Sequence, residues 1–172
     1  FSCPYCLLKA AYGNFRYAEF EEIRQKIDSV SEKVKNIGLI SAITNFHPDI
    51  KKIARYIINK GCEVSFSSMR PELIDEEFIS ILKSANSKSI TLAVESADEK
   101  IRKKINRVLT NEKLFEVVSG ALKNDIRSFK MYFIAGLPEE TLPLDIVSLC
   151  KELRKKFESY AKEKGIMPVL SI

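Results

Sequence analysis

Ser89-Ile-Thr-Leu-Ala-Val-Glu95 and Ser128-Phe-Lys-Met-Tyr-Phe-Ile-Ala135 are the two stretches that decide the fold of this chain. Each is a short, mainly apolar run with the length and composition of a β-strand. Between them lie residues 98–106 and 111–123, two helical segments that each begin at a side chain able to cap a helix. A strand, a helical connection and a second strand form the repeating unit of parallel sheets.

The same alternation extends toward both ends of the chain. Four further helices are predicted, at residues 19–35, 48–60, 75–85 and 142–164. Three further strands are predicted, at residues 37–44, 62–69 and 168–172. The pattern predicts an α/β fold whose parallel sheet can close into a barrel, stay open as a partial barrel or become doubly wound. In each case the chemistry is expected at the carboxyl ends of the strands.

The composition is that of an ordinary soluble domain. Of the 172 residues, 45% are hydrophobic and 30% are charged. A sequence with this share of hydrophobic residues is too apolar for a disordered chain. No apolar run approaches the roughly 18 residues that a membrane span needs, so no membrane partner is expected. The formal net charge of +5 is spread over Lys and Arg residues interleaved with acids. This interleaving favours solvated helix faces over a nucleic-acid surface.

Neither end of the sequence reads as a natural terminus. Phe1 is not an initiator Met, and the first residues do not have the pattern of a targeting segment. The strand predicted at residues 168–172 is followed by no connection. Residues 1–172 are therefore expected to be a single domain cut at both ends from a longer protein, with a sixth strand before Phe1.

Four cysteines occur, one close pair and two isolated residues, at positions 3, 6, 62 and 150. This is a poor disulfide framework and indicates a reducing compartment, so a cytoplasmic location is expected. Cys62 and Cys150 are predicted to be small buried residues.

The pair lies in Cys3-Pro4-Tyr5-Cys6, where two thiolates on one short loop can grip a single metal centre. By itself the spacing leaves an iron–sulfur cluster, a zinc site and neither of these open. A zinc site needs two more ligands, yet His47 is the one histidine and Cys62 begins a strand. A thioredoxin-like motif needs a helix directly after the pair, whereas the first helix is expected only near Glu19.

Phe1-Ser2-Cys3-Pro4-Tyr5-Cys6 resembles the end of the CxxxCxxC signature of the radical S-adenosylmethionine (radical SAM) superfamily. In that family three cysteines bind three irons of a [4Fe–4S] cluster, and SAM chelates the fourth iron. An aromatic residue typically precedes the last cysteine, and Tyr5 stands there. The first cysteine of the signature would fall two residues before Phe1, so Cys3 and Cys6 are the two ligands expected here.

Later segments carry the resemblance further. Ser67-Ser-Met-Arg70 resembles the end of the family's third strand, where a Ser and an Arg commonly face the pocket. The segment from Thr91 to Arg107 resembles the fourth-strand motif, whose Glu, Ser and later Arg contact the amino-acid part and the ribose of SAM. The residues that match these three are Glu95, Ser96 and Arg107.

The fifth-strand motif GxIxGxxxE, which lies against adenine in the family, is similar to Tyr132-Phe-Ile-Ala-Gly-Leu-Pro-Glu-Glu140. Ile134, Gly136 and Glu140 fit the pattern, and Tyr132 replaces its first Gly. Tyr5, Ile134 and Gly136 are therefore expected on the adenine side of the ligand.

These residue types also suit SAM chemically, since its ammonium needs a carboxylate, its carboxylate a cation and its adenine an apolar slot. Each nevertheless has a structural alternative. Glu95 could cap the helix near Asp98, Arg107 could favour a helix C-terminus, and Gly136 could serve a turn.

The resemblance implies a partial (β/α)6 TIM-like barrel and an enzyme of oxidoreductase or transferase type. It implies a [4Fe–4S] cluster, SAM and an external electron donor, with SAM cleaved to a 5′-deoxyadenosyl radical. One expectation is that the protein is similar to family members that carry a cobalamin-binding domain, which would lie outside this chain. A tRNA or ribosomal-protein methylthiotransferase core, for which RNA is a possible partner, is a second. A non-catalytic α/β binding module with zinc at CxxC is the alternative of another class.

Overall fold

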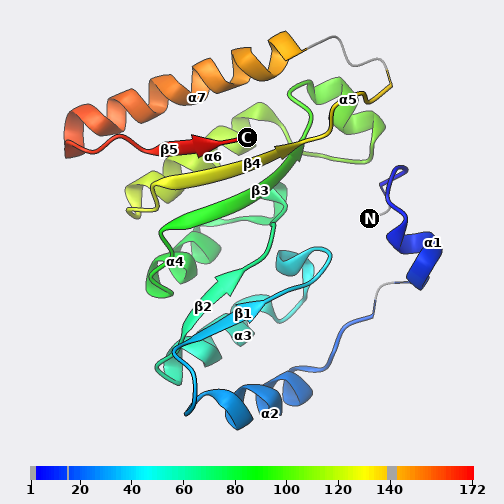
Figure 1. Cartoon of the computed structure of the whole chain (residues 1–172), viewed down its shortest axis with the longest axis vertical. Helices are drawn as coiled ribbons and strands as arrows, with labels where there is room; N and C mark the ends of the chain where they lie inside the picture. Colours follow the sequence, from blue (N-terminus) through cyan, green and yellow to red (C-terminus); the bar gives the residue numbers. More distant parts are fainter. Residues whose placement is uncertain (1–2, 15, 139–142) are drawn as a thin grey trace.

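Five strands and seven α-helices alternate in the computed structural model, which describes residues 3–14, 16–138 and 143–172 (Figure 1). The strands are β1 (Asn36–Leu39), β2 (Glu63–Phe66), β3 (Ser89–Glu95), β4 (Ser128–Phe133) and β5 (Val169–Ser171). The helices are α1 (Leu8–Tyr12), α2 (Phe20–Val30), α3 (Ile50–Asn59), α4 (Glu76–Ser84), α5 (Glu99–Lys104), α6 (Asn111–Lys123) and α7 (Pro143–Lys164). Two 3₁₀ helices, Thr44–Phe46 and Pro71–Leu73, complete the described elements.

The strands are parallel and lie side by side in chain order (Figure 1). β1 pairs with β2, β4 lies between β3 and β5, and a single bridge from Met69 to Leu92 links the two groups. A doubly wound sheet reverses its strand order partway, and this sheet does not. The predicted parallel α/β fold is confirmed, with the strand order of a partial barrel.

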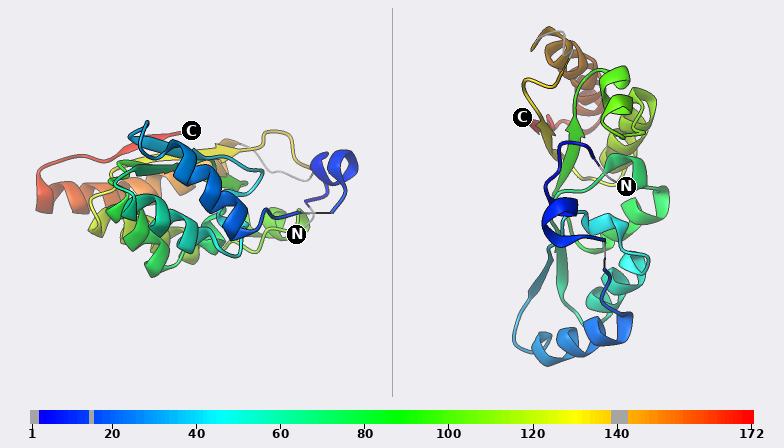
Figure 2. Two further views of the ribbon diagram at one scale, coloured as in Figure 1. Left: turned by 90° about the horizontal axis from the view of Figure 1, so that it is seen from below. Right: turned by 90° about the vertical axis from the view of Figure 1, so that its right-hand side faces the viewer.

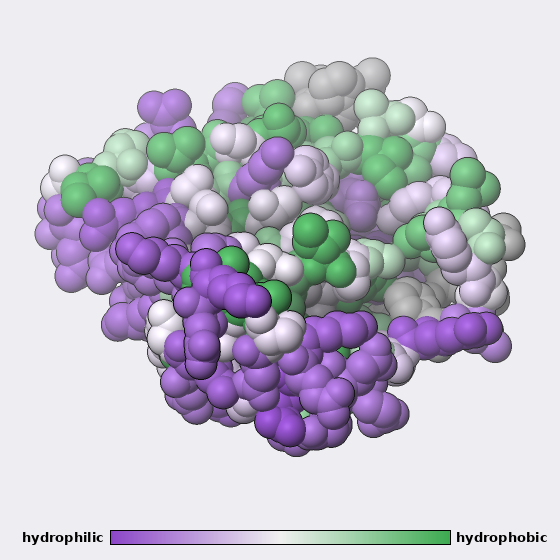
Figure 3. Space-filling model, turned by 60° about the horizontal axis from the view of Figure 1, so that its bottom comes forward, coloured by the Kyte–Doolittle hydropathy of each residue, from purple (hydrophilic) through white to green (hydrophobic). Residues whose placement is uncertain are grey.

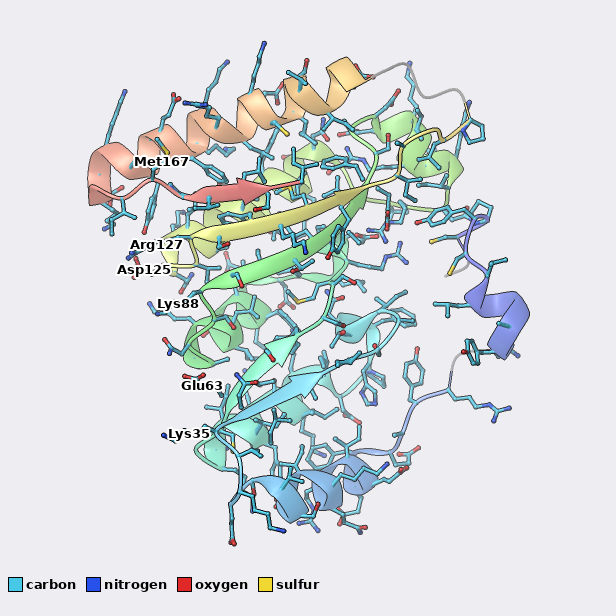
Figure 4. The ribbon with its side chains drawn as sticks, in the orientation of Figure 1. Lys35, Glu63, Lys88, Asp125, Arg127 and Met167 are labelled. Atoms are coloured by element: carbon cyan, nitrogen blue, oxygen red, sulfur yellow. The ribbon has the colours of Figure 1, made fainter. Side chains whose placement is uncertain are left out.

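The shared direction of the strands gives the sheet two distinct edges. Figure 4 labels residues at or just before the strand starts, and these gather along one side of the sheet. They are Lys35, Glu63, Lys88, Asp125, Arg127 and Met167. The carboxyl ends of the strands point to the opposite side, where the N-terminal loop lies (Figures 1 and 4).

Helices cover one face of the sheet (Figure 2). On β3 the covered face carries Ile90, Leu92 and Val94, all buried. These side chains join a hydrophobic core with residues of α4, α6, β4 and α7. On the other face, Thr91 and Ala93 are only half-buried.

Charged residues cover the outer helices, as their interleaved sequence predicts. Hydrophilic residues gather on the lower, forward part of the molecule in Figure 3, where the end that carries α2 comes forward. On α2 itself, Arg24 pairs with Glu21 and Asp28, and Lys26 pairs with Glu22. In the described parts of the chain, no helix is both long enough and apolar enough to span a membrane.

Several sequence predictions near the N-terminus need correction. The helix expected over residues 19–35 is α2, which ends at Val30. α1 follows Cys6 almost directly, where a loop was expected as far as Glu19. A helix of five residues is too short to show a helical period, and its Leu8 is 41% exposed. The first strand was expected to reach Thr44 but ends at Leu39, because residues 44–46 form a 3₁₀ helix instead.

We expect Leu92→Ala to lower the free energy of unfolding by about 2–5 kcal/mol, because Leu92 is fully buried in the main core. Thr91→Ala, one residue earlier and on the other face, should cost about 1 kcal/mol or less. Urea unfolding of both variants measures the difference, and equal losses would contradict the one-sided core.

Candidate functional site

The N-terminal loop and the carboxyl end of β3 meet through Tyr5. The Tyr5 side chain lies close enough to Glu95 and Cys3 for each of these groups to shift its pKa. Burial raises the pKa of Tyr5, and the nearby Glu95 and Cys3 raise it further. The loop that carries the cysteine pair therefore lies at the same edge of the sheet as the acid that ends β3.

Cys3 and Cys6 lie in a single tight turn, in which the Cys6 N–H donates to the Cys3 carbonyl at 3.0 Å. Both thiols are free and half-buried. Two sulfurs from one turn suit a shared metal centre. Within residues 3–14, 16–138 and 143–172, no group of three or more His, Cys, Asp or Glu side chains could hold a metal. Of the isolated cysteines, Cys62 is buried as predicted and Cys150 is half-buried.

Glu95 occupies an unusual backbone conformation, with a φ of 71°. The pairing of β3 with β4 shifts there, from Ala93 opposite Tyr132 to Glu95 opposite Phe133. Other described non-glycine residues with positive φ are of the Asn or Asp type, which tolerates this region, whereas Glu does not. A residue held in this way costs about 1–3 kcal/mol, and such strain clusters at functional sites.

Burial and neighbouring groups shift the pKa of Glu95 in opposite directions. Burial raises its pKa, while Arg107, the nearby Tyr5 hydroxyl and Arg70 each lower it. A partly desolvated carboxylate at a strand end is suited to receive the ammonium group of a ligand. The helix α5 does not need Glu95 as a cap, because Asp98 accepts from the Lys100 N–H at 2.7 Å.

Two predicted site arginines, Arg70 and Arg107, are 2% and 3% exposed and share the carboxylate of Glu72. Arg70 Nη2 lies 2.7 Å from Glu72 Oε1, and Arg107 Nη2 donates to Glu72 Oε2 at 3.4 Å. Arg107 Nη2 also donates to the Ala93 carbonyl. Sequence reasoning did not single out Glu72, although Arg70-Pro-Glu72 places it two residues from a candidate.

Asn45 fixes the loop after β1 against the rim. Its Nδ2 donates to the Arg70 carbonyl at 2.9 Å, and its Oδ1 accepts from the Arg70 N–H at 3.0 Å. Nearby, the hydroxyls of Thr44 and Ser67 are hydrogen-bonded to each other. Ser67 lies directly after β2, which ends at Phe66 rather than at the predicted Met69.

Ser96 follows Glu95 but is only 1% exposed. Its hydroxyl accepts from the Asp98 N–H at 3.2 Å, which helps to begin α5. Its predicted contact with the ligand stays a prediction.

Beyond β4, the chain continues along the same edge. The Ile134 N–H donates to the Glu95 carbonyl at 2.8 Å, and the Ile134 side chain packs with Ile101, Ile105 and Leu137. Gly136 has a φ of 81°, which favours glycine, and a Cβ placed there would meet no atom within 4 Å. Glu140 lies outside the described residues.

A cavity of about 210 Å³ opens elsewhere, where β2 and β3 diverge toward their amino ends. It is lined by residues such as Asn36, Glu63, Ser65, Asn86 and Lys88. None of the predicted site residues lines it, so it is separate from the rim described above.

Comparison with known proteins agrees with this geometry. Residues 1–153 match the family model described as the radical SAM superfamily. An uncharacterised protein of Methanocaldococcus jannaschii is 24% identical over 158 residues, which cover 90% of this chain and 35% of that protein. The ribosomal protein uS12 methylthiotransferase RimO of a Thermoanaerobacter species is 23% identical over 185 residues, covering 95% and 42%.

Two solved structures share the fold at low sequence identity. The radical SAM methyltransferase TsrM from Kitasatospora setae, with cobalamin and a [4Fe–4S] cluster bound, has a TM-score of 0.71 at 15% identity, over 90% of this chain and 32% of its own. Coproporphyrinogen III oxidase (HemN) from Escherichia coli, a radical SAM enzyme, has a TM-score of 0.60 at 16% identity, over 79% and 34%. The expected partial TIM-like barrel is thereby confirmed.

This chain spans between 32% and 42% of the length of these four proteins. The family match, by contrast, covers most of the chain and includes the cysteine turn, Glu95 and Gly136. The chain therefore belongs to the radical SAM superfamily, whose cofactors are a [4Fe–4S] cluster and SAM.

Proposed function

We propose that this chain is the core of an enzyme that cleaves SAM reductively and uses the resulting radical on a substrate. The observation that carries the proposal is the contact of Tyr5 with Glu95. It brings a turn with two free cysteines to a half-buried carboxylate at the carboxyl edge of the sheet. A ligand held by Glu95 would thus lie beside a metal centre held by Cys3 and Cys6.

The cysteines fit the cluster, because both sulfurs come from one turn at the rim. When bound, the reduced cluster would supply the electron that cleaves SAM to methionine and a 5′-deoxyadenosyl radical. The electron comes from an external donor.

The protein's own residues bind and orient the ligand in this proposal. Glu95 accepts hydrogen bonds from the SAM ammonium, and Arg107 attracts its carboxylate. Ser96, Ser67 and Arg70 line the polar side, while Tyr5, Ile134 and Gly136 form the adenine side. The helices packed against the apolar face of the sheet keep water away from that face.

A methylthiotransferase core is the second candidate. It is favoured by the match to RimO over 95% of this chain, and it would make a ribosomal protein or an RNA the substrate. A cobalamin-dependent reaction is favoured by the fold shared with TsrM, whose structure holds cobalamin. A cobalamin would then bind through a domain outside these residues.

We expect the full-length protein, reconstituted with iron and sulfide without oxygen, to be brown and to absorb near about 400 nm. With SAM and dithionite it should form 5′-deoxyadenosine. Cys3→Ala and Cys6→Ala should each abolish this product, and Cys150→Ala, a half-buried cysteine on α7, should retain it. A colourless protein with stoichiometric zinc would support the non-catalytic module instead.

The variant Glu95→Gln tests whether the Glu95 carboxylate binds SAM, through its effects on SAM affinity and on protein stability. The variant should bind SAM about tenfold more weakly or worse, because a charge-assisted hydrogen bond is lost. It should also stabilise the ligand-free protein at neutral pH. Burial raises the pKa of Glu95, so its ionisation destabilises the folded state as the pH rises from its ordinary pKa through the raised one.

The measurements are calorimetry with SAM and urea unfolding at acidic and neutral pH. Glu63→Gln, an exposed acid at the opposite edge, is the control and should change neither result. Unchanged SAM affinity in Glu95→Gln would remove the assignment of Glu95.

A further inference from the structure

Glu72 lies in the 3₁₀ helix Pro71–Leu73 and contacts two of the proposed ligand residues, Arg70 and Arg107. Its side chain is only 6% exposed. A carboxylate buried to this degree is retained only when cations or donors compensate its lost hydration. Here Arg70 and Arg107, which lie far apart in the sequence, both contact it.

The geometry makes Glu72 the common anchor of the two arginines. Arg70 Nε donates to Glu72 Oε1 at 2.8 Å, and Arg70 Nη2 lies 2.7 Å from the same oxygen. Arg107 reaches both oxygens, with Nε 3.4 Å from Oε1 and Nη2 3.4 Å from Oε2. Both guanidinium groups therefore lie around one carboxylate, and without it their like charges would repel each other.

The need for this carboxylate is increased by a third buried arginine. Arg102, on α5, is 0% exposed, and burial lowers its pKa while Glu99, Asp98 and Glu72 oppose the shift. The ion pair of Arg102 with Glu99 is long, at 3.8 Å. The rim thus concentrates positive charge, and Glu72 is the acid that lies against two of its three sources.

Glu72 also connects to the bulge that presents Glu95. Arg107 is held between Glu72 and the Ala93 carbonyl, two residues before Glu95. Among the influences that lower the pKa of Glu95, the charge of Arg107 is the strongest. Arg107 is therefore oriented by two contacts, one with the buried Glu72 and one with β3, the strand that ends at Glu95.

We infer that Glu72 is a positioning residue for SAM, an inference that rests on the function proposed above. Its carboxylate holds Arg107, together with Arg70, in the orientation that receives the carboxylate of the methionine part of SAM. Glu72 itself does not contact the ligand, so its effect reaches SAM only through the arginines.

The test compares SAM with 5′-methylthioadenosine, which keeps the adenosine but lacks the aminocarboxypropyl chain. In reconstituted full-length protein, Glu72→Gln should weaken SAM about tenfold or more by calorimetry, and 5′-methylthioadenosine by about twofold or less. Glu72→Asp, which keeps the charge on a shorter side chain, should recover part of the SAM affinity.

Glu77→Gln is the matched control, because Glu77 also pairs with two cations, Lys51 and Arg55, but is 46% exposed on α4. It should leave both affinities unchanged. If Glu72→Gln does not fold, the same comparison of the two ligands is made with Glu72→Asp, where SAM should lose more than 5′-methylthioadenosine.

Equal losses for the two ligands would show a merely structural ion pair and overturn the inference, as would an unchanged SAM affinity. A wild-type protein that does not bind SAM would instead overturn the proposed function. The two failures are therefore distinguishable.

Discussion

One backbone hydrogen bond, from the Ile134 N–H to the Glu95 carbonyl at 2.8 Å, ties the end of β3 to the end of β4. It continues the pairing of the two strands past the register shift at Glu95. Because side chains alternate along a strand, a slip of one residue would turn the site residues toward the helices. Glu95 at the end of β3 and Gly136 beyond β4 keep their relative positions only while this register holds.

Where a sequence pattern is local, it predicted the structure well. β3 and α6 have the expected bounds, since β3 alternates along its whole length and Thr110 caps α6 through the Lys113 N–H. β1 ends five residues earlier than expected, at Leu39 rather than Thr44. The 3₁₀ helix Thr44–Phe46 follows it, and there the Asn45 side chain binds the backbone of Arg70, a contact that no local pattern contains.

The site shows the same division between local and distant causes. The motifs predicted Tyr5, Glu95, Arg70 and Arg107 as site residues, and the structure places their side chains near one another. Glu72 could not, because an acid in the first turn after a proline usually faces solvent and favours the helix dipole. It is buried here because two arginines from distant segments meet around it.

Features that cost stability are concentrated at the carboxyl edge of the sheet. They are the left-handed backbone of Glu95, the desolvation of its carboxylate and the burial of Arg70, Arg102 and Arg107. The opposite side chains of the same strand, such as Leu92 and Val94, lie in the core that offsets these costs. β3 thus stabilises the fold with one face and carries, at its end, the strained and charged group that a fold alone would not retain.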